Sequence, residues 1–153
     1  MNKKYIITEN SLFIKETGKT LYQIQSLVNI ISPPFIISKG DFGGYIEHEG
    51  NLSQDGECWI FPGCTASDNS RVIQDSIISD NTEISDNVLI SGNSVIKEAK
   101  LSGFSSVHNS TVSGPFIISN NARIINSIIS NKDTDNIIHF SGNTVLDGCI
   151  FGV

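Results

Sequence analysis

A six-residue repeat in the middle of the chain constrains the fold more than any other feature. Residues 76–96 read S-I-I-S-D-N-T-E-I-S-D-N-V-L-I-S-G-N-S-V-I, in which a pattern of six positions, here called places, begins four times. The first place holds Ser, Thr or Val, the third always holds Ile, and the last two are Asp-Asn or Gly-Asn. An amphipathic helix needs apolar residues three and four apart, and an uninterrupted strand alternates without corners. A period of six fits neither, but it fits a short strand and a turn repeated coil after coil, which is a β-solenoid.

The chemistry of the six places predicts which side chains point inward. Because side chains alternate along a strand, the first and third places share one face and the second place takes the other. The small or β-branched first place and the Ile at the third place should therefore face a core. Asp-Asn and Gly-Asn suit the corners, since these residues tolerate left-handed backbone and hydrogen-bond their own turns. Three such sides make a triangular coil of about 18 residues, with successive coils about 4.8 Å apart.

The third place can be followed almost to the end of the chain. It recurs every six residues up to Ile96, and every five or six residues up to Ile129. Since the first place shifts together with it, we interpret the five-residue steps as shortened corners. The polar residues 131–136 are expected to bulge from one side as a loop, after which the pattern resumes at Ile138. The sequence thus predicts an all-β fold, a single-stranded triangular parallel β-helix of about six coils over residues 46–153.

Residues 1–45 do not follow the repeat and are expected to form a small N-terminal β cap. The segments 3–8, 11–15 and 20–27 are typical of strands separated by polar turns. Residues 20–27 would also suit a short helix. One more strand is predicted at residues 35–38, just before the solenoid.

The net charge of −6 is unevenly placed along the chain. Residues 1–45 hold five Lys and three acidic residues, whereas residues 46–153 hold five basic and thirteen acidic residues. An acidic solenoid repels a phosphate backbone, so no nucleic-acid partner is expected. No segment has the apolar length of a signal peptide or a membrane span, so we expect a cytoplasmic protein without a membrane partner.

The three cysteines, Cys58, Cys64 and Cys149, all fall at the first place of the repeat. Their number is odd, and none of them forms a Cys-x-x-Cys pair. We therefore expect small, buried, reduced thiols and no metal site.

A longer run of residues carries a resemblance to a known family. Lys39-Gly40-Asp41-Phe42-Gly43-Gly44-Tyr45-Ile46-Glu47 follows Thr20-Leu21-Tyr22-Gln23-Ile24 and precedes Asn51-Leu52-Ser53-Gln54 and Cys58-Trp59-Ile60. With the hexads after it, this pattern resembles phage and prophage hexapeptide-repeat proteins, several of which are described as acyltransferase-like because of their fold. The resemblance covers essentially the whole chain. It implies a bacterial host cell, a left-handed helix, and a Gly-Asp-aromatic-Gly-Gly junction between an N-terminal β cap and the solenoid.

Sorting the outward second places by side gives one apolar stripe. Five of its six residues are apolar and stack coil on coil, and a contiguous stripe of this kind marks an interface. We expect this side to join copies of the chain into a dimer or trimer. Coverage by the N-terminal cap and a tolerated exposed face are the alternatives. The predicted interface residues are Trp59, Ile77, Val95, Ile128 and Val145, with Thr111 as the polar member of the stripe.

A second side carries polar groups of a different kind. Counting assigns Arg71, Arg123 and His139 to its second place, and His108 to its fourth. On adjacent coils these groups could bind an anion or serve acid–base chemistry, and the alternative is a solvated face without a role. The hexapeptide acyltransferases use a catalytic His, for which His108 and His139 are the candidates. No Ser-His-Asp set, helix or long loop accompanies them.

Two hypotheses of different classes follow. The first is a non-enzymatic, phage-derived binding or structural module that is oligomeric, needs no cofactor, and inhibits or sequesters a host protein. The second is a coenzyme A-dependent acyltransferase of the hexapeptide-repeat type, with His108 or His139 as the base. Since similarity of fold does not establish activity, the first hypothesis is preferred.

Overall fold

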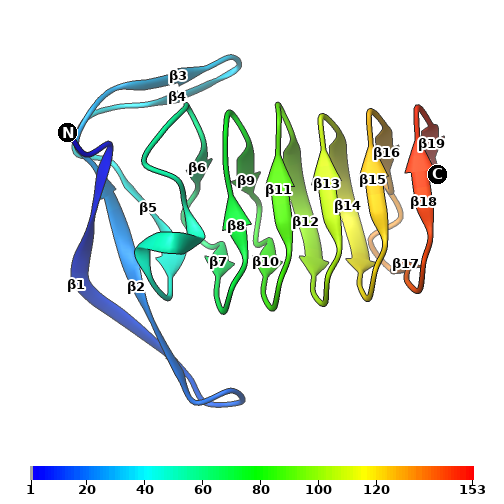
Figure 1. Cartoon of the computed structure of the whole chain (residues 1–153), viewed down its shortest axis with the longest axis horizontal. Helices are drawn as coiled ribbons and strands as arrows, with labels where there is room; N and C mark the ends of the chain where they lie inside the picture. Colours follow the sequence, from blue (N-terminus) through cyan, green and yellow to red (C-terminus); the bar gives the residue numbers. More distant parts are fainter. Residues whose placement is uncertain (1) are drawn as a thin grey trace.

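The computed structural model describes residues 2–153 and consists almost entirely of strands (Figure 1). It confirms the predicted all-β class, because stacked parallel coils make a β-solenoid of about six turns with the N-terminal strands at one end. The N-terminal strands are β1 (Tyr5–Ile14), β2 (Lys19–Ser26), β3 (Ile30–Ser32), β4 (Phe35–Ile37) and β5 (Phe42–Ile46), followed by the 3-10 turn η1 (Glu49–Asn51). The solenoid strands are β6 (Trp59–Ile60), β7 (Thr65–Ala66), β8 (Arg71–Val72), β9 (Ile77–Ser79), β10 (Glu83–Ile84), β11 (Leu89–Ser91), β12 (Val95–Leu101), β13 (Ser106–His108), β14 (Thr111–Ile118), β15 (Arg123–Ile125), β16 (Ile128–Ser130), β17 (Ile138–Phe140), β18 (Val145–Asp147) and β19 (Ile150–Gly152).

The parallel strands form three ladders, which we name sides A, B and C. Side A consists of β6, β9, the first parts of β12 and β14, β16 and β19. Side B consists of β5, β7, β10, the second parts of β12 and β14, and β17. Side C consists of β8, β11, β13, β15 and β18. Each complete coil contributes to the three sides in the order A, B, C.

The core is made by the residues that the repeat places inward. Ile78, Ile84, Ile90 and Ile96 occupy successive third places, and none is more than 1% exposed. Burying an Ile stabilises a fold by about 1.5–3 kcal/mol relative to leaving it in water. Such residues stack along each of the three sides, and their burial provides most of the driving force for stacking the coils.

Buried hydroxyl groups at the first place are satisfied by the corner that precedes them. After a six-residue step, Thr82 Oγ1 donates to the carbonyl of Ser79, three residues earlier, at 2.7 Å. After a five-residue step, Ser110 Oγ donates to the carbonyl of His108, two residues earlier, at 2.8 Å. The five-residue steps are thus shortened corners with the register kept, as predicted. Ser and Thr suit this place because a buried polar group must find a partner.

Left-handed backbone recurs at the corners, as the Asp, Asn and Gly residues predict. At the corner between sides B and C, the φ angles of Asp68, Asp86 and Asn120 lie between 55° and 58°. Side chains link successive corners there, since Asp68 Oδ2 accepts a hydrogen bond from the Asp86 N–H at 3.1 Å. Asp86 Oδ2 does the same for the Gly103 N–H at 2.8 Å. The corner residues therefore serve both the turn and the stacking.

The polar loop of residues 131–136 extends the corner between sides A and B. Asn131 holds its base, because its Nδ2 donates to the carbonyls of Pro115 at 3.2 Å and Asn136 at 2.7 Å. The backbone N–H of Asn131 also donates to the carbonyl of Ser113 at 2.8 Å. The loop thus leaves the coil and rejoins it at one corner.

This geometry corrects two assignments made from the sequence. The assignment of sides from the sequence assumed that the loop takes the place of the side B strand in this coil. In the structure, the side B strand β17 follows the loop directly. His139 consequently aligns with Ile117 on side B and is not part of side C. Val145 aligns with Arg123 on side C and is not part of side A, where Ile150 takes the expected position beside Ile128.

The N-terminal unit joins the solenoid through a shared strand. β1 is one strand with an irregular register between Ile7 and Ser11, where the sequence had suggested a turn between two strands. Residues 20–27 contribute to β2, so the alternative of a short helix is wrong. β5 pairs antiparallel with β2 and parallel with β7. The boundary expected between residues 45 and 46 therefore falls inside a strand common to both parts.

A second antiparallel hairpin, β3–β4, runs along the long axis over the first coils (Figure 1). Only the region of its second strand was predicted. Ile30 and Ile37 are each 1% exposed, and Phe35 of the same hairpin packs on Phe61 of the first coil with ring centroids 5.7 Å apart. Their neighbours Ile31 and Ile36 are 62% and 71% exposed. One face of the hairpin therefore packs on the solenoid, and the other faces away from it.

Close approach of two backbones explains the paired glycines of the junction. A Cβ atom at Gly43 would lie 2.6 Å from the Ile60 carbonyl oxygen and 2.7 Å from Trp59 Cζ2. A Cβ atom at Gly44 would lie 2.5 Å from the Cys64 carbonyl oxygen. Distances this short exclude any larger residue without movement of the first coil, so the two glycines allow β5 to pack against it.

Candidate functional site

Side C carries three of the four polar residues that the sequence singled out. Arg71 lies on β8, His108 on β13 and Arg123 on β15, and all three are exposed. Arg123 aligns with Ser106 one coil before it, so it lies diagonally from His108. Arg71 is two coils away from β13 in the other direction, and His139 is on side B. The four residues therefore do not converge on one site.

Hydrogen bonds fix the ring of His108 in an orientation that does not suit a general base acting on Ser91. Asn109 Oδ1 accepts from the Asn93 N–H at 3.0 Å, which leaves Nδ2 of Asn109 to donate to His108 Nε2 at 3.1 Å. The neutral ring then carries its proton on Nδ1, which donates to Ser91 Oγ at 2.8 Å. A catalytic base would have to accept the hydroxyl proton instead. The pair therefore acts as a structural contact between neighbouring coils.

The predicted apolar stripe is divided by the N-terminal unit. Trp59 and Ile77 are 0% and 1% exposed, so they are covered within one chain and are not available to a second copy. This corrects their assignment to an interface and agrees with the alternative that the cap covers part of the stripe. Val95 is half-buried, while Ile128 is 54% exposed. Ile150, which replaces Val145 on this side, is 87% exposed.

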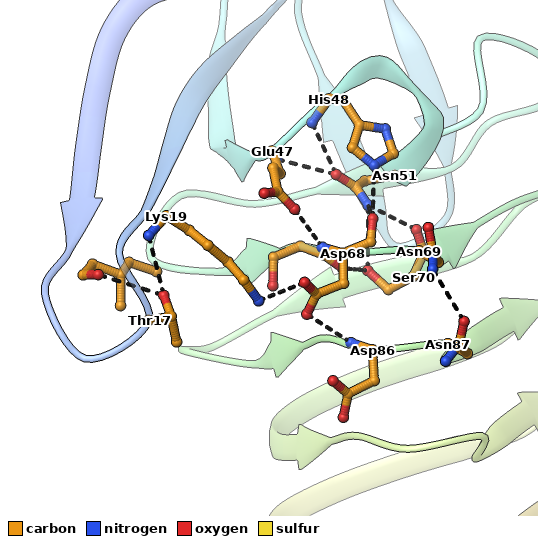
Figure 2. Close-up of polar contacts among 12 residues, drawn as sticks. Thr17, Lys19, Glu47, His48, Asn51, Asp68, Asn69, Ser70, Asp86 and Asn87 are labelled. Atoms are coloured by element: carbon orange, nitrogen blue, oxygen red, sulfur yellow. Dashed lines mark hydrogen bonds and ion pairs between the residues drawn. The ribbon is translucent and has the colours of Figure 1, made fainter.

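A polar network fastens the cap to the first coils at the corner between sides B and C (Figure 2). Asn51 is fully buried, and its Oδ1 accepts from the N–H groups of Glu47 at 3.1 Å and His48 at 3.0 Å. Its Nδ2 donates to the carbonyls of Asp68 at 3.1 Å and Ser70 at 2.9 Å. Glu47 and Asn51 of the junction thus help to hold the cap on the first coils.

Asp68 is the centre of this network. Its backbone N–H donates to Glu47 Oε1 at 2.6 Å, and its carbonyl accepts from His48 Nε2 at 2.7 Å. The carboxylate pairs with Lys19 Nζ at 2.5 Å, and Figure 2 shows the lysine reaching across from β2. The hydrogen bond from Lys19 lowers the pKa of Asp68, and that from the Asp86 N–H adds to the effect.

A buried lysine anchors the start of the chain to the first coil. Lys4 is 6% exposed, and its Nζ donates to the carbonyls of Gly56 at 3.1 Å and Cys58 at 2.8 Å. The same Nζ lies 3.2 Å from Cys58 Sγ, and burial raises the pKa of that thiol. Tyr5 beside it donates from its hydroxyl to the carbonyl of Leu52 at 2.6 Å. These contacts hold β1 on the end of the solenoid.

An open cleft of about 420 Å³ lies between the hairpin and the corner of sides A and B. The rings of Phe35 and Phe61 pack with their centroids 5.7 Å apart, and Lys97 Nζ lies 5.9 Å from the centroid of Phe35. Asp80 and Asn81 supply polar groups at its rim. Such a lining suits a group that is partly apolar and partly polar.

Sequence reasoning did not identify this cleft or the buried lysine. Lys97 is unremarkable as a fourth-place residue, and Phe35 belongs to a segment predicted only as a strand. The available signal was the run Ile30-Ile31-Ser32-Pro33-Pro34-Phe35-Ile36-Ile37, in which two short apolar segments flank a Pro-Pro turn. That run predicts a hairpin, but it does not indicate where the hairpin docks.

Comparisons with known proteins give no assignment. A scan of the chain against protein-family models finds no match, and a search of curated proteins finds no relative. Among the residues that the structure describes, no helix has the length and apolar character needed to cross a bilayer. The function must therefore be argued from the surfaces described above.

Proposed function

We propose that the chain is a non-enzymatic β-solenoid binding module that self-associates through the uncovered part of side A. The observation that supports this most directly is the exposure of Ile128 and Ile150, 54% and 87%, on neighbouring strands of one side. An exposed contiguous apolar surface gains free energy when it is covered. As part of the same proposal, the resemblance to phage proteins favours a role in a bacterial cell, in which the assembled module inhibits or sequesters a host protein.

The hydrogen bonds of His108 favour this proposal over the acyltransferase alternative. The ring is engaged by Ser91 and Asn109, with its proton directed at the serine. His139 lies on a different side, aligned with Ile117. A general base must accept a proton from its partner, whereas the Nδ1 of His108 donates its proton to Ser91.

Sedimentation velocity of the wild-type chain tests the proposal over a range of about 10–100 µM, where weak specific interfaces are populated. We expect a concentration-dependent oligomer that is lost in the double variant Ile128→Glu/Ile150→Glu. Val145→Glu is the matched control, because Val145 is also 54% exposed but lies on side C. A wild-type monomer throughout the range, or an unchanged oligomer in the double variant, would contradict the proposal.

Calorimetric titration with acetyl-coenzyme A tests the alternative. We expect no binding at micromolar strength. Turnover with any acyl acceptor that is lost in His108→Ala or His139→Ala would instead establish the enzyme.

A further inference from the structure

The β3–β4 hairpin covers one half of side A and leaves the other half open. Phe35 of the hairpin packs on Phe61, next to the first strand of the side, with ring centroids 5.7 Å apart. Trp59 and Ile77, the outward residues of the first two coils, are 0% and 1% exposed. At its far end, the hairpin reaches the third strand of the side, where Lys97 lies over the Phe35 ring. Within residues 2–153, no such cover lies over the next three strands, β14, β16 and β19. Exposure of their outward residues accordingly rises to 87% at Ile150.

The outer face of the hairpin has the same character as the surface that is left open. Ile31 and Ile36 are direct cross-strand partners and are 62% and 71% exposed. Ile128 and Ile150 are likewise direct neighbours on side A. The hairpin segment from residue 30 to 38 contains no charged residue. The side A strands of the last three coils also contain none, since they read Thr-Val-Ser, Ile-Ile-Ser and Ile-Phe-Gly.

Resting on the function proposed above, we infer that two copies pack with their sides A facing each other, and that each hairpin lies between the two solenoids. The inner face of the hairpin covers the first three coils of its own chain, and its outer face covers the last three coils of the partner. This arrangement requires a two-fold axis parallel to the strands of side A, so that the two solenoids run antiparallel. The two hairpins then approach each other tip to tip near the middle of the interface.

The spacing of packed sheets supports this arrangement. Sheets that pack face to face lie about 10 Å apart, so one hairpin layer between two solenoids gives two ordinary packing distances. A two-fold axis makes the two contacts identical, and two-fold dimers are the commonest soluble oligomers. When the two solenoids overlap along their full length, a direct contact between the two sides A is blocked by the hairpins themselves. The occupant that fits the open half is therefore a layer with the thickness and apolar face of this hairpin.

Charge and area also bear on the partner. Each chain has a net charge of −6, so two copies repel each other at long range, and a charged contact surface would add to this repulsion. The two surfaces that meet here are uncharged. At ordinary spacings, three coils by three residues make a patch of about 14 Å by 10 Å, and the dimer has two such contacts. Two contacts of two surfaces each bury about 560 Å² in all, well below the roughly 1,200 Å² of a standard specific interface, so only weak association at high protein concentration is expected.

Charge exchange between two variants tests this inference by sedimentation velocity. In a dimer of the hairpin variant Ile31→Lys/Ile36→Lys, both contacts would bury lysines against an apolar surface. In a dimer of the coil variant Ile128→Glu/Ile150→Glu, both contacts would bury glutamates in the same way. We expect each variant alone to associate at least about tenfold more weakly than the wild type. In an equimolar mixture, one contact is wild type and the other pairs Lys with Glu. The mixture should therefore form the dimer that neither variant forms alone.

Controls and outcomes separate this inference from the proposed function. Ile6→Lys changes an exposed residue of β1, 39% exposed and outside the hairpin, and should leave the dimer unchanged. Circular dichroism of all variants checks that the coils remain folded. An oligomer that persists in the hairpin variant but is lost in the coil variant would overturn the hairpin contact and leave self-association through side A standing. If the mixture fails to restore the dimer, the reciprocal arrangement is wrong. A wild-type monomer would overturn both proposals.

Discussion

Asp68 illustrates how one side chain at a corner connects three parts of the chain. Its carboxylate pairs with Lys19 of the N-terminal ribbon at 2.5 Å and accepts from the N–H of Asp86 on the next coil at 3.1 Å. Its backbone also bonds to the junction, through Glu47 and His48. In the sequence, Asp68 is an ordinary corner residue that supplies left-handed backbone. The additional role arises because the ribbon of β1 and β2 approaches this corner.

This pairing predicts a pH dependence of stability. The hydrogen bond from Lys19 is the largest cause that lowers the pKa of Asp68 below its ordinary value of 3.8. A carboxyl group with a lower pKa in the folded state stabilises the fold above the unfolded pKa, and this contribution is lost as the pH falls through the folded pKa. We expect urea unfolding to show a free energy that decreases below about pH 4, and Asp68→Asn to weaken that decrease. Glu16→Gln, in an exposed turn, serves as the control; an unchanged pH profile in Asp68→Asn would show that the ion pair does not persist in solution.

At the scale of elements, strand β10 shows how strictly a two-residue strand separates its two faces. Ile84 is 1% exposed in the core, whereas its neighbour Glu83 is exposed and pairs with Lys100 of the next coil at 3.1 Å. The side chain of Glu83 remains about half exposed, so this ion pair contributes little to stability. The two residues are adjacent in the chain but meet opposite environments.

A pair of alanine variants checks this register. Ile84→Ala should lower the free energy of unfolding by about 2–5 kcal/mol, because it removes buried methyl groups and leaves a cavity between coils. Glu83→Ala should change it by less than about 0.5 kcal/mol. The midpoints of urea unfolding measure both effects. Equal destabilisation by the two variants would show that the inward assignment of Ile84 is wrong.

At the scale of the whole molecule, burial of the core is uneven from one end to the other. The cap covers the first coils, where Cys58 and Cys64 are fully buried. In the last coil, the inward residues Phe140, Leu146 and Phe151 are only partly buried. Cys149 at its first place is likewise intermediate rather than buried, which corrects the expectation for that thiol. Local opening should therefore begin in the last coils.

Thiol labelling measures this difference along the chain. We expect Cys149 to react first under native conditions, and Cys58 and Cys64 to react only when the whole fold opens. Burial raises the pKa of Cys64 to about 11, so little reactive thiolate is present at neutral pH even when the site is reached. Mass spectrometry of the labelled protein counts and locates the modified residues. Simultaneous labelling of all three cysteines would mean that the solenoid opens as a single unit.

The sequence by itself determined the inward residues, the corners, the shortened steps and the position of the polar loop. These features depend on the alternation of side chains along a strand and on the few residues that accept left-handed backbone, and both are local properties. The prediction of buried Ile78, Ile84 and Ile90 holds for this reason.

Only the tertiary structure decided what covers the outward residues and where the chain goes after the loop. From the sequence, Trp59 and Ile77 could belong to an interface, a surface covered by the cap or a tolerated exposed face, and the repeat contains nothing that distinguishes the three. The sequence put His139 and Val145 on the wrong sides because a loop of any length can rejoin the coil at the corner where it left. Here the loop does so, and Asn131 holds its base by a hydrogen bond to the carbonyl of Pro115. The proton of His108 is placed by Asn109, whose own orientation depends on a backbone N–H one coil away. Contacts between coils and between the cap and the coils carry no period in the sequence, so they become visible only when the chain is folded.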